Sequence, residues 1–160
     1  MIPLGSKIKD NITGYQGIAT ARVTHLYGCV HIAIQPQELK DGIPQKERLF
    51  DEQRIQIIER AEREPQQPKF DLGSTVRDKI TGLVGIVTVW VDELNGNTTV
   101  NITPKILHEG KPVESINLPE DRVELIEATK PEVSPDSSAT SGSIEGYSRP
   151  SQTRESASRW

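Results

Sequence analysis

The stretch KIKDNITGYQGIAT, Lys7–Thr20, decides the fold of this chain because it occurs twice: a near copy, TVRDKITGLVGIVT, spans Thr75–Thr88. Both copies open with alternating polar and apolar residues, the pattern of a β-strand with one buried face. A Thr-Gly pair follows, and a second glycine stands three residues after the first, which is typical of a turn that leads into a bent strand. Each copy therefore predicts a strand, a turn and the start of a second strand.

The duplication extends well beyond this stretch. Residues 4–59 align with residues 72–127 at a constant offset of 68 without a gap, and about 22 of 56 positions are identical. Identical pairs include Gly5/Gly73, Asp10/Asp78, Thr13/Thr81, Gly14/Gly82, Gly17/Gly85, Gly28/Gly96, Pro36/Pro104, Gly42/Gly110, Pro44/Pro112 and Arg54/Arg122. Self-similarity at a fixed offset indicates two copies of one structural unit.

The repeats divide the chain into four parts. We expect a first repeat at 1–59, a linker at 60–71, a second repeat at 72–127 and a disordered tail at 128–160. Pro65 and Pro68 oppose helix in the linker and favour a short, stiff connector. The tail is dominated by Ser, Thr, Pro and charged residues, with too few apolar side chains to offset the entropy of ordering it. Either the tail has no role, or its terminal Trp160 docks on a partner or on the chain itself.

The sequence of each repeat predicts five short strands. In the second repeat these are STVRD, LVGIVTVWVDEL, NTTVNITPKI, SINLP and DRVELIE, while LHEGKPVE and its counterpart ELKDGIPQ predict loops. Five strands in under 60 residues favour a small barrel over a sandwich, because closure removes exposed edges. We therefore predict an all-β fold of two tandem SH3-like five-stranded barrels. The predicted interior residues are Ile8, Ile18, Val23, Ile32, Ile34, Leu49, Ile55, Val76, Ile86, Val91, Val100, Ile102 and Val123.

Composition agrees with small cores and a soluble protein. Apolar residues make up 34% of the 160 residues and aromatic residues 4%, so each repeat can bury only a thin core. The chain contains no run of about 18 apolar residues and opens without a secretory signal pattern. The single cysteine, Cys29, cannot form an internal disulfide, which agrees with a reducing compartment. We expect a cytoplasmic protein.

The repeated segment carries a resemblance to known families. LGSTVRDKITGLVGIVTVWV, starting at Leu72, resembles the opening of a KOW element, and such elements form SH3-like barrels in ribosomal and transcription-elongation proteins. The pattern G-S-x-[IV]-x-D-x-I-T-G-x-x-G-I-x-T, together with FDEQRIQII, also resembles small uncharacterised proteins of tailed bacteriophages. The second repeat departs from that pattern, with Asn97 for Cys29 and LPEDR for FDEQR. The resemblance implies an SH3-like fold and a phage origin, hence a place in the host cytoplasm or the virion, and no established activity.

Motifs for catalysis are missing, so we predict that the chain is not an enzyme. It has no phosphate-binding glycine loop, no catalytic triad spacing and no zinc-binding cysteine pair. His25, Cys29 and His31 flank a hairpin turn in HLYGCVH and carry metal-capable atoms. The matching residues of the second repeat are Glu93, Asn97 and Thr99, and a fourth ligand is missing. The prediction is therefore ordinary hairpin residues, with no metal and no cofactor.

The identical acids and glycines predict structural turns. Carboxylates that follow a strand commonly accept hydrogen bonds from turn N–H groups. The expected turn residues are Asp10, Thr13, Gly14 and Gly17, with Asp78, Thr81, Gly82 and Gly85 in the second repeat. Asp51 with Arg54, and Asp121 with Arg122, are expected to form surface ion pairs or ligand contacts.

Candidate binding residues are those at which a partner would find charge or an aromatic ring: Lys7, Lys9, Tyr15, Arg22, Tyr27 and Trp90. Trp90 corresponds to Arg22, so it is either an exposed contact residue or a cover over the neighbouring repeat. We predict a protein partner that contacts the face between the repeats. Two alternatives stay open: nucleic acid bound by the first repeat, and a small ligand or nucleotide held between the repeats. The first repeat has seven basic and seven acidic residues and the second five and nine, which weakens the nucleic-acid alternative.

Overall fold

The computed structural model describes residues 1–63 and 65–129. Met1–Lys130 form one compact unit. The expected disordered tail and Trp160 fall outside the described residues from position 130 onwards. The described chain consists of β-strands and two 3₁₀ turns, which confirms the all-β class. None of its helices is long and apolar enough to cross a membrane.

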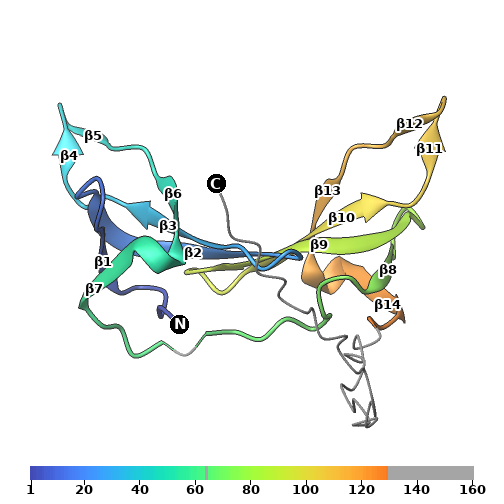
Figure 1. Cartoon of the computed structure of the whole chain (residues 1–160), viewed down its shortest axis with the longest axis horizontal. Helices are drawn as coiled ribbons and strands as arrows, with labels where there is room; N and C mark the ends of the chain where they lie inside the picture. Colours follow the sequence, from blue (N-terminus) through green and yellow to red (C-terminus); the bar gives the residue numbers. More distant parts are fainter. Residues whose placement is uncertain (64, 130–160) are drawn as a thin grey trace, which may run out of the picture. The chain divides into compact units, whose positions relative to one another are not determined.

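Two sets of elements follow one another in the same order (Figure 1). The first set is β1 (Lys7–Asp10), β2 (Gln16–His25), β3 (Val30–Gln35), β4 (Leu39–Lys40), β5 (Ile43–Pro44), β6 (Arg48–Asp51), η1 (Glu52–Arg54) and β7 (Ile55–Glu59). The second set is β8 (Thr75–Asp78), β9 (Val84–Glu93), β10 (Thr98–Pro104), β11 (Leu107–His108), β12 (Lys111–Pro112), β13 (Ile116–Pro119), η2 (Glu120–Arg122) and β14 (Val123–Glu127). Every element of the second set begins 68 residues after its counterpart.

Ten of the strands belong to one sheet. The order β7-β1-β2-β3-β6 in the first repeat matches β14-β8-β9-β10-β13 in the second, and β2 pairs with β9 to join them. The expected closure into two barrels is not observed, since no sheet in the described part of the chain closes. The 3₁₀ turn η1 separates β6 from β7 and redirects the chain, so these two strands are not folded back on each other as a hairpin. The second repeat has η2 at the same place.

The β2–β9 pairing relates the two repeats symmetrically. Val23 lies opposite Val91, its own counterpart in the other repeat, and the antiparallel register runs outward from this pair. Leu26 N–H donates to the carbonyl of Thr88 over 2.9 Å, and the counterpart of Leu26, Leu94, donates to the carbonyl of Thr20 over 2.7 Å. The same surface of each repeat thus meets itself, as in the two-fold interface of a homodimer.

The predicted loops contain two additional hairpins, β4–β5 and β11–β12. In the first, Leu39 pairs with Pro44 and Lys40 with Ile43, which leaves Asp41 and Gly42 as a two-residue turn. Both turn residues have positive φ, 54° and 75°, which is the type I′ geometry favoured by Asp-Gly. The second repeat has the same geometry with φ of 52° and 75°. The Asp-Gly pair was the signal that could have identified the first hairpin from sequence.

Each repeat has its own apolar core, and part of the predicted interior is wrong. Leu49 is 57% exposed. Ile18 and Val23, like their counterparts Ile86 and Val91, are only half-buried. The register of β2 against β3 shifts between Ala19 and Ala21, and the buried residues of β2 are Gly17 and Ala19 before this bulge and Arg22 after it. The first core consists of Ile2, Leu4, Ile8, Ala19, Ile32 and Ile34, and the second of Val76, Val87, Trp90, Val100, Ile102, Leu118 and Val123.

Candidate functional site

The identical acids of the two repeats serve the fold. Asp10 is completely buried, and its Oδ2 accepts hydrogen bonds from the Thr13 backbone N–H over 2.8 Å and from the Thr13 hydroxyl. Arg54, at the end of η1, donates from Nε and Nη2 to the two carboxylate oxygens, each over 2.9 Å. In the second repeat Arg122 donates to Asp78 in the same way over 2.7 Å. Each pair therefore ties the first turn of its repeat to the start of its last strand.

These contacts correct the predicted partners of the two arginines. Arg54 was expected to pair with Asp51, but Asp51 instead lies 3.1 Å from His31 Nε2. Asp121, the expected partner of Arg122, contacts Lys69. Hydrogen bonds from the arginine hold the pKa of both Asp10 and Asp78 well below the usual range, and the threonine of each turn lowers it further.

Gly17 and Gly85 allow two strands to approach closely. A Cβ at Gly17 would lie 2.1 Å from the carbonyl oxygen of Gln35, and a Cβ at Gly85 would lie 2.5 Å from that of Thr103. No side chain fits at either distance. Gly14 and its counterpart have positive φ, 74° and 76°, in the turn that precedes this approach. The shared turn residues are thus explained by architecture, so function must be sought where the repeats differ.

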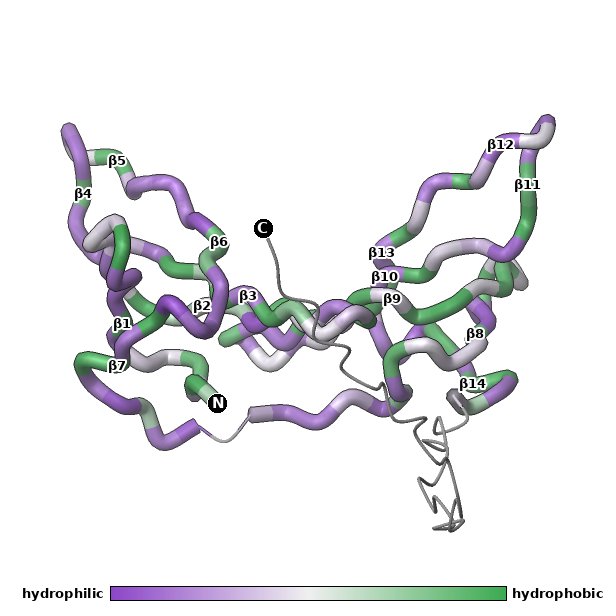
Figure 2. The backbone as a smooth tube through the Cα atoms, in the orientation of Figure 1, coloured by the Kyte–Doolittle hydropathy of each residue, from purple (hydrophilic) through white to green (hydrophobic). Residues whose placement is uncertain are grey.

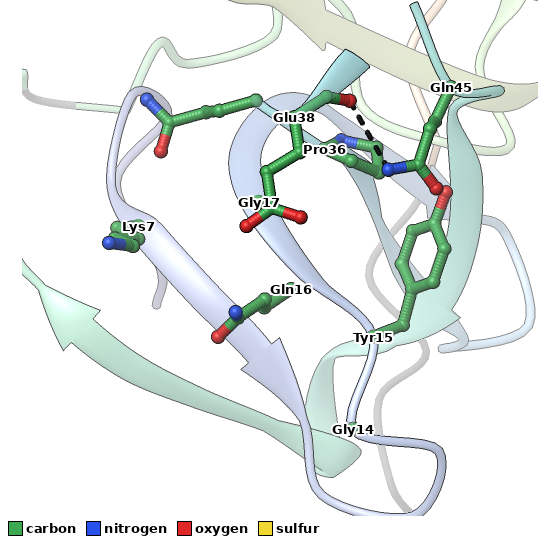
Figure 3. Close-up of a pocket in the computed structure, with 9 residues that line it drawn as sticks. Lys7, Gly14, Tyr15, Gln16, Gly17, Pro36, Glu38 and Gln45 are labelled. Atoms are coloured by element: carbon green, nitrogen blue, oxygen red, sulfur yellow. Dashed lines mark hydrogen bonds between the residues drawn. The ribbon is translucent and has the colours of Figure 1, made fainter. Parts of the chain in front are cut away.

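The first repeat has a polar hollow where the turn after β1 faces the base of the β4–β5 hairpin (Figure 3). Its volume is about 250 Å³. The lining residues are Lys7, Gly14, Tyr15, Gln16, Gly17, Pro36, Gln37, Glu38 and Gln45. Three amides, one phenol and one charge of each sign offer many hydrogen-bonding groups and no net charge.

Side-chain hydrogen bonds fix the walls of this hollow. Gln35 Nε2 donates to the Gln45 carbonyl over 2.7 Å, and Gln45 Nε2 donates to the Glu38 carbonyl over 3.2 Å. The Tyr15 hydroxyl donates to the carbonyl of Lys46. These bonds attach the base of the hairpin to the sheet, so the hollow is formed before any partner arrives.

Neighbouring side chains also hold the Tyr15 ring. The ring lies 5.4 Å from that of Phe50, and the Arg48 guanidinium lies 5.2 Å from its centroid. An aromatic side chain held in this way adds contact area to a partner at a small entropic cost.

Four lining positions of the hollow are aliphatic in the second repeat. The counterparts of Tyr15, Gln16, Glu38 and Gln45 are Leu83, Val84, Ile106 and Val113. Ile106 is 57% exposed. The counterparts of Lys7 and Gln37 stay polar, as Thr75 and Lys105, and Figure 2 shows hydrophobic residues at β11 but hydrophilic ones at the tip of this hairpin. The second repeat therefore replaces part of the polar lining with aliphatic side chains.

The six predicted binding residues do not form one surface. Lys7 and Tyr15 line the hollow, and Lys9 is exposed on the same face of β1 as Lys7. Tyr27 is 92% exposed at the tip of the β2–β3 turn. The remaining two, Arg22 and Trp90, are buried.

Arg22 and Trp90 are buried, so Arg22 does not take the outer position expected for it and Trp90 is not the exposed contact residue that was one of its two expected roles. Arg22 is 8% exposed and donates to both carboxylate oxygens of Glu52 over 2.6 Å and 3.0 Å. Trp90 is 4% exposed, and its Nε1 has no hydrogen-bond partner among the described residues. Trp90 belongs to the core of the second repeat, and both residues line one hollow with the linker residues Gln66, Gln67 and Pro68.

The two histidines near the β2–β3 turn contact each other. The rings of His25 and His31 meet edge to face with centroids 5.1 Å apart, and Cys29 is exposed. Within the described part of the chain, no group of three or more His, Cys, Asp or Glu residues is placed to hold a metal ion.

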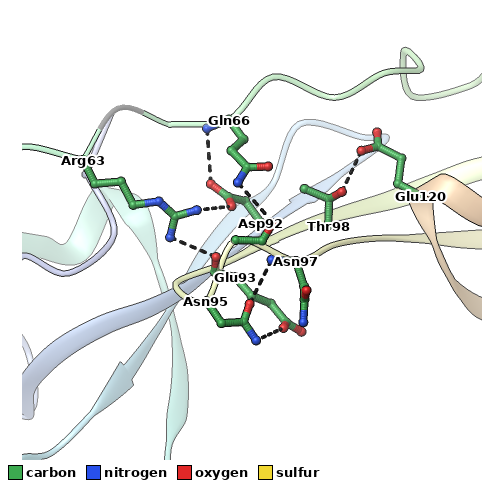
Figure 4. A network of polar contacts seen from close by, with 9 residues as sticks. Arg63, Gln66, Asp92, Glu93, Asn95, Asn97, Thr98 and Glu120 are labelled. Carbon is green, nitrogen blue, oxygen red and sulfur yellow. Dashed lines mark hydrogen bonds and ion pairs between the residues drawn. The ribbon is translucent and has the colours of Figure 1, made fainter.

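Sequence reasoning missed two buried acids that bind the linker (Figure 4). Asp92 accepts from Arg63 Nη2 over 2.9 Å and from the Gln66 backbone N–H over 3.4 Å. Glu120 accepts from the Lys69 backbone N–H over 2.6 Å and from the Thr98 hydroxyl over 2.8 Å. Asp92 is 1% exposed and Glu120 is 2% exposed. The signal for Asp92 was a lone acid inside an apolar strand, since such a residue needs a partner when buried.

Comparisons with known proteins add no assignment. No protein-family model, no curated protein and no solved structure matches the chain.

Proposed function

We propose that this chain is a noncatalytic binding module that engages a protein partner through the Tyr15 hollow of the first repeat and the aliphatic surface at the same place on the second. The observation that carries the proposal is the replacement of Tyr15, Gln16, Glu38 and Gln45 by aliphatic residues while the surrounding glycines and proline are kept. Duplication in this proposal supplies one scaffold with two unlike contact surfaces.

A protein partner suits the chemistry of the hollow better than nucleic acid. Neutral amides and a phenol match the amide groups of a peptide, and an aromatic ring provides an anchor. Phosphate binding needs clustered positive charge. Among the candidate binding residues with positive charge, Arg22 is buried against Glu52, and Lys7 lines the hollow together with the acid Glu38.

The proposal also includes the finer assignment of each repeat as an SH3-like unit that is open in this chain. The order β7-β1-β2-β3-β6, with a 3₁₀ turn before the last strand, supports it. In this arrangement β2 and β9 pair with each other, and this pairing between repeats takes the place of a strand pairing that would close each repeat on itself.

Selection of peptides from a displayed random library tests the proposal. Peptides selected on the whole chain should bind with saturable affinity, and the double variant Tyr15→Leu/Gln16→Val should weaken them at least about tenfold, the effect of losing an anchor and its hydrogen bonds. The matched control is Tyr27→Leu, which removes an exposed phenol outside the hollow.

Two outcomes would contradict the proposal. One is a set of selected peptides that bind the double variant as tightly as the original chain. The other is a salt-sensitive shift of RNA or DNA in a gel that disappears with Lys7→Ala/Lys9→Ala, because it would assign the first repeat to nucleic acid.

A further inference from the structure

The Tyr15 hollow adjoins a second hollow of the first repeat. This second hollow has a volume of about 340 Å³ and extends from β1 to the start of the linker. Lys7 and Gln37 line both hollows, so the two are neighbours, and together we call them the Lys7 groove. The other residues around the second hollow are Gly5, Ile18, Glu59, Arg60 and Ala61. Two adjoining hollows suit an extended segment of chain better than one compact ligand.

Four charged side chains line this groove. Glu38 lines only the first hollow (Figure 3), and Lys7 lines both. Glu59 and Arg60 line only the second. Within the described part of the chain, none of the four forms an ion pair. Lys7 is half-buried and the other three are exposed, so their charges are accessible to a partner.

The second repeat bridges the position at which these hollows meet. Lys105 Nζ donates to the hydroxyl of Thr75 over 2.9 Å. These two residues are the counterparts of Gln37 and Lys7, the pair that both hollows share in the first repeat. A hydrogen bond therefore connects in the second repeat the two positions that stand on either side of the groove in the sequence of the first.

Most of the charge of the groove is also absent from the second repeat. The counterparts of Lys7, Glu38 and Arg60 are Thr75, Ile106 and Ala128. Glu59 is kept as Glu127. A groove lined by charges of both signs is thus a feature of the first repeat alone among the two copies.

A ligand of one charge sign does not match this lining. A nucleic-acid backbone would bring negative charge beside Glu38 and Glu59. A polybasic segment would bring positive charge beside Lys7 and Arg60. Because like charges brought together at an interface weaken binding, a segment with charges of both signs fits the groove best.

We propose that the Lys7 groove binds an extended segment of the protein partner that carries both signs of charge, with a Lys or Arg side chain beside Glu38 and an Asp or Glu side chain beside Arg60. This inference rests on the proposed function and adds the chemistry of the bound segment. In the first hollow, the ring of Tyr15 offers contact to the aliphatic stem of the basic side chain. In the second hollow, Lys7 adds its charge to that of Arg60.

Double-mutant cycles on the full chain test this proposal. A peptide selected on the full chain is resynthesised with its basic residue changed to Gln and, separately, with its acidic residue changed to Gln. Each peptide is titrated against the original chain, Glu38→Gln and Arg60→Gln. The basic residue should couple to Glu38 and the acidic residue to Arg60, each by about two- to fivefold in Kd, as partly exposed ion pairs do. Both couplings should decrease as salt is added.

The matched control is Lys40→Gln. It removes an exposed charge from the β4–β5 hairpin that lines neither hollow, so it should leave the peptide affinities unchanged. Glu38 and Arg60 are exposed and form no ion pair within the described residues, so both variants should keep the Tm of the original chain.

The outcomes separate this inference from the proposed function. Peptides that keep their affinity when both charges are removed, yet lose it with Tyr15→Leu/Gln16→Val, would overturn the inference and leave the proposed function in place. Selected segments that are neutral or carry one sign of charge would overturn it in the same way. If no peptide binds the chain at all, the proposed function fails and the inference fails with it.

Discussion

The two repeats have the same turns, but the side chains around these turns differ in polarity. Around the first turn, Asp10 and Asp78 have the same hydrogen-bond partners, and Gly17 and Gly85 allow the same close approach. A few residues away, Tyr15 is replaced by Leu83. The comparison teaches that residues shared by the copies report on the fold, whereas residues that differ mark the places where a partner can be recognised.

The largest expected effect comes from removing the shared acids. Asp10→Ala leaves Arg54 without its bidentate partner and removes the acceptor of the Thr13 N–H, and Asp78→Ala does the same to Arg122. Each variant should lower the Tm by on the order of 10 °C in calorimetry. Asp41→Ala, at an exposed hairpin tip, is the matched control. Unequal losses in the two repeats would contradict the structural equivalence drawn here.

The shared glycines should give the next largest effect. Gly17→Ala places a Cβ against the Gln35 carbonyl, and Gly85→Ala places one against the Thr103 carbonyl. Each should cost about 2 kcal/mol of unfolding free energy, measured by urea denaturation. Gly28→Ala is the control, because its positive φ of 87° brings strain while nothing lies within 4 Å of the added Cβ. A negligible cost of both Gly17→Ala and Gly85→Ala would contradict the close approach, because neither glycine has the positive φ that strains Gly28→Ala.

Lowering the pH should gradually lower the thermal stability of both repeats. The pKa of Asp10 and of Asp78 is lowered from 3.8 in the folded chain, so the unfolded chain binds more protons. The stability contributed by these pairs is therefore fully present above the ordinary pKa and is lost as the pH falls through about 4 and below. The Tm should fall by several degrees between about pH 5 and pH 3, and by less in Asp10→Ala/Asp78→Ala. An identical pH profile for the double variant would assign the acid sensitivity to other groups.

The smallest expected effect concerns the two hairpins. Gln45→Val gives the first hairpin the residue of the second, and it removes the donor to the Glu38 carbonyl. Amide exchange in the β4–β5 hairpin should become roughly 5 to 10 times faster, as expected for the loss of one hydrogen bond, with no change in global Tm. Exchange in the β11–β12 hairpin is the internal control. An unchanged rate would mean that Tyr15 and Gln35 hold the hairpin by themselves.

The site was only partly predictable from sequence. Asp10, Gly14 and Gly17 could be assigned to turns because the pattern is local and occurs twice. Tyr15, which lines the hollow, could be chosen as a candidate because it is aromatic and differs between the copies, but the amides beside it could not. Gln35 and Gln45 contact each other through a hairpin whose return depends on the Asp41-Gly42 turn. Arg22 was assigned to a surface because Val23 was expected to point inward, but the buried residues of β2 are Gly17, Ala19 and Arg22.

The sequence by itself determined the strands, the shared turns and the duplication, because each of these depends on residues close together in the chain or on identity between the copies. Only the tertiary structure decided which residues lie inside and how the repeats meet. Arg54 reaches an acid 44 positions away, and Val23 pairs with Val91 across the linker. Neither contact leaves a local pattern. The first depends on the pairing of the first and last strands of one repeat, and the second on which strand edges remain open after the repeats have formed.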